Sequence, residues 1–229
     1  MSLVKSIGGK KVNFDFNKDF ISIFSDKIKV GDLKFINQTL KDLHPSDVAN
    51  LIENLTVDTR AKLIEIEEFN IDPDIFIEIN ESIQSEVLQL LSTDSIAKIL
   101  KRLESDNAIA ILENLEVDKK NAVLDKLPPK DRFLLEEGLS YPEDSAARIM
   151  QREFTAVPSN WSVGQTIDYL RENKDLPEEF SEIFIVDNDF KPIGTVPSSR
   201  VLRTSRDSKM NTIMREMPVL ISVNMDKEE

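Results

Sequence analysis

The stretch LSTDSIAKILKRLESDNAIAILENLEVDKKNAVLDKL, residues 91–127, places a leucine at every twelfth position. Aligning the rest of the chain in blocks of twelve extends this leucine column in both directions, and only Glu67 interrupts it. The column consists of Leu43, Leu55, Ile79, Leu91, Leu103, Leu115, Leu127 and Leu139. A fixed period of this kind indicates a repeat architecture.

A polar residue three positions after the column predicts the N-cap of a helix, because its side chain accepts hydrogen bonds from the free N–H groups there. These candidates are Ser46, Asp58, Asn70, Ser82, Asp94, Asp106 and Asp118. Apolar residues follow them at helical spacing. Helices of about two turns are unstable alone in water, so neighbouring units must cover their apolar faces. The pattern therefore predicts an all-α superhelical solenoid of short helices.

The pattern changes after Leu139. Short β-rich runs bounded by turn residues, at 154–157, 182–187, 191–197 and 218–223, predict strands. Between the first two runs, residues 162–173 have the apolar spacing of a helix. We therefore expect a mainly α chain whose solenoid is followed by a small α/β domain of β-α-β-β order. GDLKFINQTLKDL (31–43) predicts one helix leading into the solenoid, and residues 1–30 form a poorly determined leader.

Charge is concentrated in the solenoid. The chain of 229 residues has a net charge of −13, and residues 43–139 contain 21 acids and 10 bases. Nine acids lie between Leu63 and Ala97 without one Lys or Arg, seven of them in EIEEFNIDPDIFIEINE (65–81). An acidic surface repels nucleic acid, whose binding requires basic patches. It suits cations or a basic partner.

Several functional classes are excluded by the sequence. No run approaches the ~18 apolar residues of a membrane span, and the first residues lack the apolar core of a signal peptide. We expect this chain to be soluble and intracellular. His44 is the single histidine and there is no cysteine, so a soft-ligand metal site is not expected. Nucleophile elbow, Walker and dinucleotide-binding motifs are absent, so we do not expect an enzyme.

Three segments resemble one known family. YPEDSAARIMQREFTAV (141–157) resembles the joint between the acidic N domain and the first CBS domain of MgtE-type magnesium transporters. LHPSDVANLIENL (43–55) resembles the start of that N domain, and EIFIVDNDFKPIGTV (182–196) the core of a CBS unit. The resemblance implies an N domain at 31–139, a first CBS domain at 140–206 and the start of a second, truncated CBS domain at 207–229.

The resemblance also implies a function. The chain is expected to be the cytosolic Mg²⁺-sensing part of a transporter, at the cytoplasmic face of the cell membrane, with its own membrane domain beyond the chain end. In this family Mg²⁺ bridges acidic faces of the N and CBS domains and favours the closed pore, and CBS domains mediate a homodimer. The residues alone leave an alternative: a helical-repeat interaction module whose acidic face docks a basic protein without ion sensing.

Carried over by position, the metal-facing acids implied by the resemblance are Asp74, Asp106, Asp226 and Glu228. A further family acid, one helical turn after Asp106, falls on Ala110.

Two more positions depart from the family pattern. The glycine that supplies a backbone ligand in the joint is replaced by Arg148, which introduces a cation at that place. In CBS domains that bind adenine nucleotides, an acid holds the ribose. The corresponding segment here is PSSR (197–200), where Arg200 replaces the acid and argues against a ribose contact.

Overall fold

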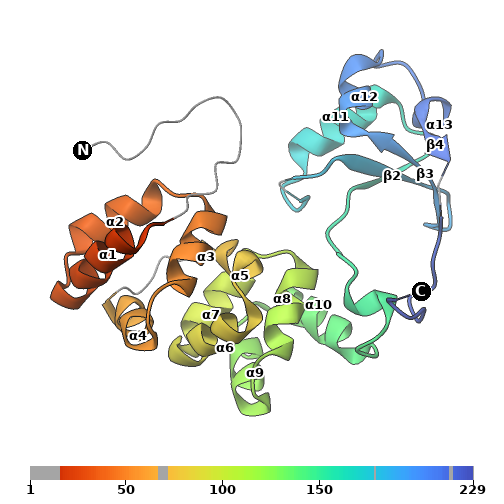
Figure 1. Ribbon diagram of the computed structural model, residues 1–229. Coiled ribbons are helices and arrows are strands. Elements are labelled where there is room, and N and C mark those ends of the chain that lie inside the picture. The colour runs from red at the N-terminus through yellow and green to blue at the C-terminus, as the bar shows by residue number, and fades with distance from the viewer. Residues whose placement is uncertain (1–15, 67–71, 178, 217–218, 229) are drawn as a thin grey trace. The chain divides into compact units, whose positions relative to one another are not determined.

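The computed structural model describes residues 16–66, 72–177, 179–216 and 219–228. The chain divides into two compact units, Met1–Glu136 and Glu137–Glu229 (Figure 1). The described residues of the first, the helical unit, form helices and short connections. The second, the sheet unit, contains a four-stranded sheet among the described residues. A mainly α chain followed by a small α/β domain is therefore confirmed.

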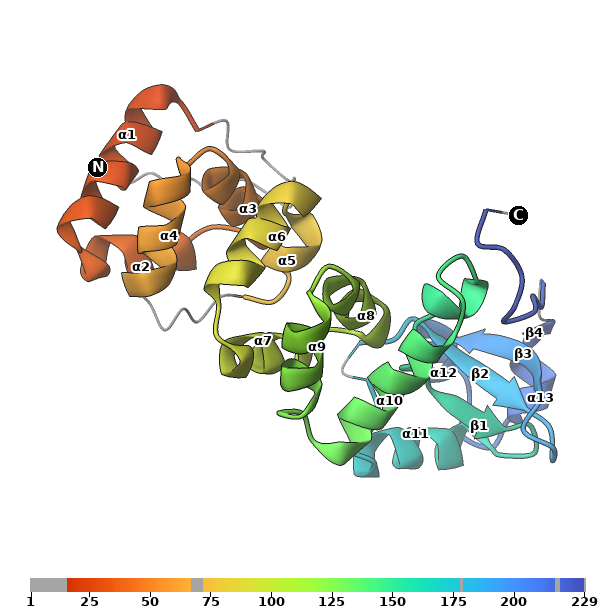
Figure 2. The ribbon, with the colours of Figure 1, turned by 90° about the horizontal axis from the view of Figure 1, so that it is seen from below.

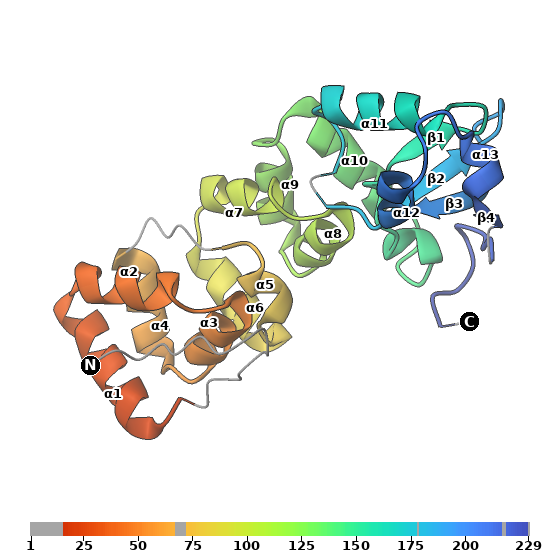
Figure 3. The ribbon, with the colours of Figure 1, turned by 90° about the horizontal axis from the view of Figure 1, so that it is seen from above.

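The described helices of the first unit are short and follow one another closely along the chain (Figures 2 and 3). Their bounds are α1 Lys18–Val30, α2 Leu33–Lys41, α3 Pro45–Glu53, α4 Val57–Ile66, α5 Ile75–Glu78, α6 Glu81–Leu90, α7 Thr93–Leu100, α8 Ser105–Glu113 and α9 Val117–Leu124. A further helix, α10 Pro129–Ser140, begins in this unit and ends in the next. The helix expected within residues 31–43 is α2. Helices two or three apart in sequence pack together, as in the pairs α1–α4, α3–α5, α4–α6 and α7–α9.

The leucine column supplies part of the core of this unit. Leu55, Ile79, Leu91, Leu115 and Leu127 are all buried. Each lies in the short connection that precedes a helix. The column therefore covers the apolar helix faces from the connections rather than from within the helices.

The helices begin two residues earlier than the sequence pattern predicted. The N-caps are the residues directly after the column: His44, Asn80, Ser92, Glu104 and Glu116. Asn80 and Ser92 accept hydrogen bonds from the backbone N–H groups of Ser82 and Ser95. The predicted caps in these helices lie inside the first turn, where a negative side chain is stabilised by the helix dipole without capping. The predicted cap Asn70 lies outside the described residues.

Cations close the C-terminal ends of neighbouring helices. Lys62 donates to the Lys29 carbonyl at the end of α1, over 2.7 Å. Lys119 donates to the carbonyls of Leu88 and Gln89 at the end of α6, over 2.8 and 3.0 Å. The last carbonyls of a helix have no partner within it, so these long-range contacts both satisfy them and fix the spacing of the helices.

The sheet unit has the predicted β-α-β-β order and then continues. Its elements are the 3-10 turn η1 Ala146–Arg148, β1 Ala156–Pro158, α11 Val163–Glu172, β2 Glu182–Val186, β3 Pro192–Pro197, α12 Ser198–Arg203, α13 Met210–Ile213 and β4 Arg215–Glu216. The strands lie in the order β1-β2-β3-β4, with β1 parallel to β2 and the other pairs antiparallel. Figures 2 and 3 show α11 alongside β1.

One face of the sheet carries the core. Ile183, Ile185 and Val196 alternate along β2 and β3 and are fully buried against residues of the three helices α11, α12 and α13. Met210 of α13 belongs to this core, and its N–H donates to the Trp161 carbonyl over 2.9 Å. The region expected to open a second CBS domain, 207–229, therefore begins with residues packed on the first sheet.

The strand predicted at 218–223 is wrong for its described part. Residues 219–223 have no strand assignment, and Val219, Leu220 and Ile221 are exposed. Their composition is typical of a strand, but a strand forms only where another pairs with it. Among the described residues, no strand pairs with this segment.

Candidate functional site

Asp74 lies at the start of α5, on a turn whose backbone is held by buried neighbours and by a side-chain hydrogen bond. Ile75 and Phe76 are buried beside it, and the Phe76 carbonyl accepts a hydrogen bond of 2.7 Å from the Gln84 side chain. The Asp74 carboxylate is exposed and makes no capping hydrogen bond, while its backbone N–H donates to Asp72 Oδ1 over 3.3 Å. A fixed backbone therefore presents this carboxylate to water.

The acidic stretch around Asp74 is only partly neutralised. Two of its acids obtain cations from elsewhere in the sequence: Glu86 pairs with Arg60 and Asp94 with Lys126. The acids of α5 and its flanks are exposed, and no cation pairs with them in the described part of the chain: Asp72, Asp74, Glu78 and Glu81. Glu67 and Glu68 lie outside the described residues. The exposed acids thus form a surface of one sign, which attracts cations.

Asp106 lies in the first turn of α8 rather than at its N-cap, which is Glu104. Its Oδ1 accepts a hydrogen bond of 2.8 Å from the backbone N–H of Asn107, and the residue is half-buried. Ala110, one turn later, is exposed and offers no ligand oxygen from its side chain. Asp106 thus has a structural role at the helix start and retains one carboxylate oxygen outside that hydrogen bond.

Asp226 and Glu228 lie together in the last described residues. Asp226 Oδ1 accepts the backbone N–H of Glu228 over 2.9 Å, and both side chains are exposed. Asp226 is also paired with Ser145 through an isolated antiparallel bridge. The C-terminal segment therefore lies against the joint motif of the same unit.

Further contacts hold this C-terminal segment in place. Ala146 donates to the Met225 carbonyl over 2.7 Å and Ala147 to the Val223 carbonyl over 3.0 Å. Lys227 donates to the Glu143 carbonyl over 3.1 Å, and its ammonium lies 3.6 Å from Asp144 Oδ1. Sequence analysis missed Asp144 and Lys227. No local signal could have found the pairing because their positions are more than eighty residues apart.

Arg148 is buried in the joint, and its Nη1 donates to the Gly138 carbonyl in α10 over 3.1 Å. This cation, which replaces the family glycine, is therefore directed to the end of a helix, where positive charge is stabilised.

The predicted acids are divided between the two units. Asp74 and Asp106 lie on different helices of the helical unit, and Asp226 and Glu228 lie in the sheet unit. Within the ranges that the structure describes, no three His, Cys, Asp or Glu side chains are placed to hold a metal ion. Likewise, no described helix is both long and apolar enough to cross a membrane.

Comparison with family models finds two matches in the chain. Residues 43–144 match the model of the MgtE intracellular N domain, and residues 146–207 match the CBS domain model. A curated relative, the magnesium transporter MgtE of Enterococcus faecalis, is 23% identical over 95 residues. That match covers 42% of this chain and 21% of the relative, so the chain spans about a fifth of the transporter it matches.

Two solved structures share the fold. The soluble part of a magnesium transporter has a TM-score of 0.70 at 19% identity and covers 91% of this chain and 82% of its own. The cytosolic domain of the Mg²⁺ channel MgtE in complex with ATP has a TM-score of 0.78 at 20% identity, covering 91% and 85%. At such identities the similarity demonstrates the fold alone.

Proposed function

We infer that this chain, a member of the MgtE family that joins the intracellular N domain to a CBS domain, is a regulatory region that senses intracellular Mg²⁺ for a magnesium transporter. The observation that supports this proposal is the anchored, exposed carboxylate of Asp74 within a surface of acids that no described cation neutralises.

The donor set suits Mg²⁺. This ion prefers carboxylate oxygens in octahedral geometry and retains several waters, so it needs few protein ligands. Exposed carboxylates such as Asp74 and Asp226 can contribute one oxygen each without a preformed cage. The alanine at position 110 removes one ligand expected from the family, so we expect a weak and largely hydrated site.

Regulation follows from differential binding. Acidic surfaces that approach one another repel, and a divalent ion that binds both stabilises the arrangement in which they are close. We propose that Mg²⁺ bridges acids of the N domain, Asp74 and Asp106, with acids of the CBS region, Asp226 and Glu228. The ion shifts the population toward the closed pore only to the extent that it binds that state more tightly.

The remaining expectations form part of the same proposal. The whole protein has a membrane domain, lies with this region at the cytoplasmic face and dimerises through its CBS domains. The chain has a regulatory rather than an enzymatic role.

The test is a Mg²⁺ titration followed by small-angle scattering and by calorimetry, with Na⁺ adjusted so that ionic strength stays constant. The response is compared in the native chain, in Asp74→Asn with Asp226→Asn, and in Asp118→Asn. Asp118 is a matched control because it is also an exposed acid in the first turn of a helix. We expect Mg²⁺ to compact the native chain and the Asp118 variant but not the double variant.

The alternative, an acidic surface that docks a basic protein, predicts a different outcome. Its charge responds to total salt through screening alone and not to Mg²⁺ at fixed ionic strength. Absence of any Mg²⁺-specific heat or compaction in the native chain would therefore refute the sensing role.

A further inference from the structure

Helix α5, which has Asp74 at its start, ends after one turn, and the two backbone groups that would continue it bind side chains of other helices. Its last backbone bond joins the Ile79 N–H to the Ile75 carbonyl over 3.0 Å. A longer helix would next join the Asn80 N–H to the Phe76 carbonyl. In the structure each of these two groups has a different partner.

The partners come from α3 and α6. Glu53, the last residue of α3, accepts the Asn80 N–H through Oε1 over 2.6 Å. Gln84 of α6 donates from Nε2 to the Phe76 carbonyl over 2.7 Å, and this residue is half-buried. The turn that carries Asp74 is therefore held at its C-terminal end by contacts to two other helices.

Gln84 also connects this turn to α8, the helix whose first turn holds Asp106. Its Oε1 accepts a hydrogen bond of 3.0 Å from Nδ2 of Asn114, which is the C-cap of α8. A backbone carbonyl accepts but cannot donate, so the Gln84 amide must turn its nitrogen toward Phe76. Its oxygen is then left for Asn114, and one amide donates to α5 while accepting from α8.

We propose that Gln84 is a positioning residue for cation binding, whose amide holds the turn of Asp74 and the helix of Asp106 as one body. This inference rests on the proposed Mg²⁺-sensing function and adds the residue that sets the spacing of two of its acids. Binding is weaker where the ligands must be ordered at the moment of binding. Mg²⁺ is sensitive to this because it requires near-ideal octahedral geometry. Gln84 acts through the backbone of α5 and supplies no carboxylate itself.

A purely structural role of Gln84 makes a different prediction. Losing a hydrogen bond that only stabilises the fold lowers the free energy of unfolding but leaves the Mg²⁺ affinity of the folded chain unchanged. The decisive measurement is therefore that affinity, obtained by calorimetry on the whole chain with Na⁺ adjusted to hold ionic strength constant. Circular dichroism confirms that each variant is folded. Hydrogen exchange of the Ile79 N–H, measured without divalent ions, reports the turn itself.

Gln84→Met removes both hydrogen bonds at nearly constant side-chain length. We expect it to weaken Mg²⁺ binding about fivefold, which is typical of a lost hydrogen bond, and to speed the exchange of the Ile79 N–H. Asn114→Ala leaves the Phe76 contact in place and should weaken binding about twofold. Asn114 is exposed, so this variant keeps the test decisive if Gln84→Met does not fold. The double variant should match Gln84→Met, because the Asn114 contact needs the Gln84 amide.

Gln89→Met is the matched control, since Gln89 is an exposed glutamine of the same helix. It should change neither the Mg²⁺ affinity nor the exchange at Ile79. If the native chain gives no Mg²⁺-specific heat, the sensing role and this inference fail together. If the native chain responds but Gln84→Met binds Mg²⁺ as tightly as Gln89→Met, the sensing role stands and the positioning role is refuted. Faster exchange at Ile79 with unchanged affinity would likewise overturn the inference and assign Gln84 to the fold alone.

Discussion

Replacing Arg60 by methionine should destabilise the helical unit more than any other charge removal among its described residues. The Arg60 side chain is 7% exposed, and its guanidinium group makes hydrogen bonds to one carboxylate and three backbone carbonyls. Nε and Nη2 each lie 2.9 Å from an oxygen of Glu86, in a bidentate pair. Nη1 donates to the carbonyls of Ile52, Glu53 and Leu55, at and just beyond the end of α3, over 3.1, 3.3 and 2.7 Å.

The magnitude follows from what the substitution leaves behind. Methionine retains most of the apolar stem of Arg60 but leaves the carbonyls of α3 and the Glu86 carboxylate without this partner. Removing one member of a buried ion pair costs about 3–5 kcal/mol. Glu86 is 28% exposed and water can partly replace the arginine, so we expect the lower end, about 3 kcal/mol. With a urea dependence of about 1.5 kcal/mol/M, the midpoint should fall by about 2 M.

Urea unfolding can be followed separately in the two units. Circular dichroism at 222 nm reports mainly the helical unit, and the fluorescence of Trp161, the only tryptophan, reports the sheet unit. Arg60→Met should shift the first transition and leave the second in place. Glu86→Gln retains the three carbonyl contacts and should cost about 1 kcal/mol.

Arg132→Met provides the control for this experiment. Arg132 also pairs with two acids, Asp125 and Glu136, but all three are exposed, so the loss should be small. If Arg60→Met shifts the circular dichroism transition no further than Arg132→Met, the burial of the Arg60 contacts does not stabilise the unit as argued. A simultaneous shift of the Trp161 signal would show that the units unfold as one.

Three further outcomes are expected. Gly194→Ala would place a Cβ against the Arg215 carbonyl, so β3 and β4 must separate. Thermal unfolding followed by Trp161 fluorescence should show a loss of about 1–3 kcal/mol, and an unchanged midpoint would contradict this packing. Phe190 has a left-handed backbone, with φ 61, and the residue is 82% exposed. Phe190→Gly should relieve the backbone strain and stabilise the sheet unit by about 0.5–1 kcal/mol in the same assay. A loss of stability would mean that the ring contributes more than the backbone strain costs. The hydrogen bond from Lys27, together with the backbone N–H of Phe35, lowers the pKa of Asp32 from 3.8. The stabilisation by the ionised Asp32 is therefore complete above pH 3.8 and is lost as pH falls through the lowered folded-state pKa. Asp32→Asn should flatten the acid limb of the stability–pH curve, which urea titrations at several pH values can measure.

Sequence alone predicted the fold where local patterns determine it. The leucine column, the helical spacing after it and the alternation in residues 182–187 gave the mainly α architecture and the small α/β domain. The N-caps were placed two residues late because Asp106 and its equivalents have the side chains of caps. The backbone of Glu104, two residues before Asp106, is extended, and Glu104 is the N-cap instead. Composition does not distinguish a cap from an acid in the first turn, because both stabilise the helix N-terminus.

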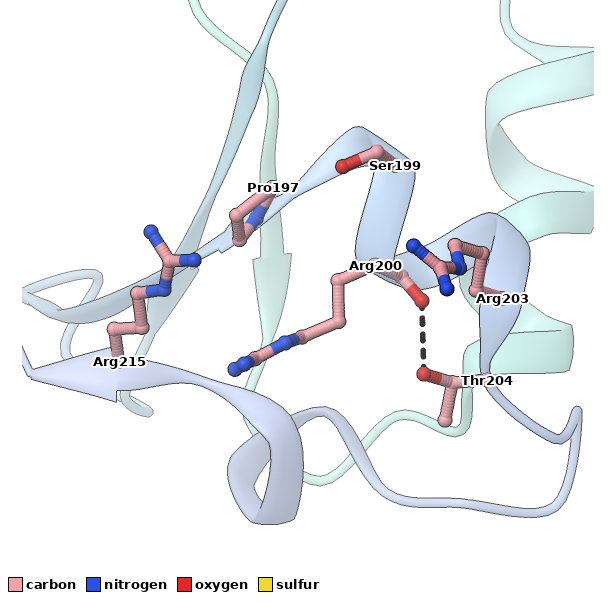
Figure 4. Close-up of a pocket in the computed structure, with 6 residues that line it drawn as sticks. All are labelled: Pro197, Ser199, Arg200, Arg203, Thr204 and Arg215. Carbon is pink, nitrogen blue, oxygen red and sulfur yellow. Dashed lines mark hydrogen bonds between the residues drawn. The ribbon is translucent and has the colours of Figure 1, made fainter.

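The contacts that position the helices were beyond sequence reasoning. Arg60 and Glu86 are 26 residues apart, and Lys119 reaches carbonyls about thirty residues away. No periodic pattern signals such pairs, since a surface cation and a helix-closing cation look the same in sequence. Arg200 and Arg215 show the same limit. Arg200 was noted for the acid it replaces, but that both residues line one cavity (Figure 4) depends on the pairing of β4 with β3.

Charge is distributed unevenly along the chain. Acids outnumber bases in the helical unit, and two of the acids in its base-free stretch are neutralised by Arg60 and Lys126. The acids around Asp74 are left exposed, without a cation among the described residues. A divalent cation that binds them would relieve their mutual repulsion, whereas added monovalent salt only screens it. The Mg²⁺ titration at fixed ionic strength therefore separates an ion sensor from an acidic docking surface.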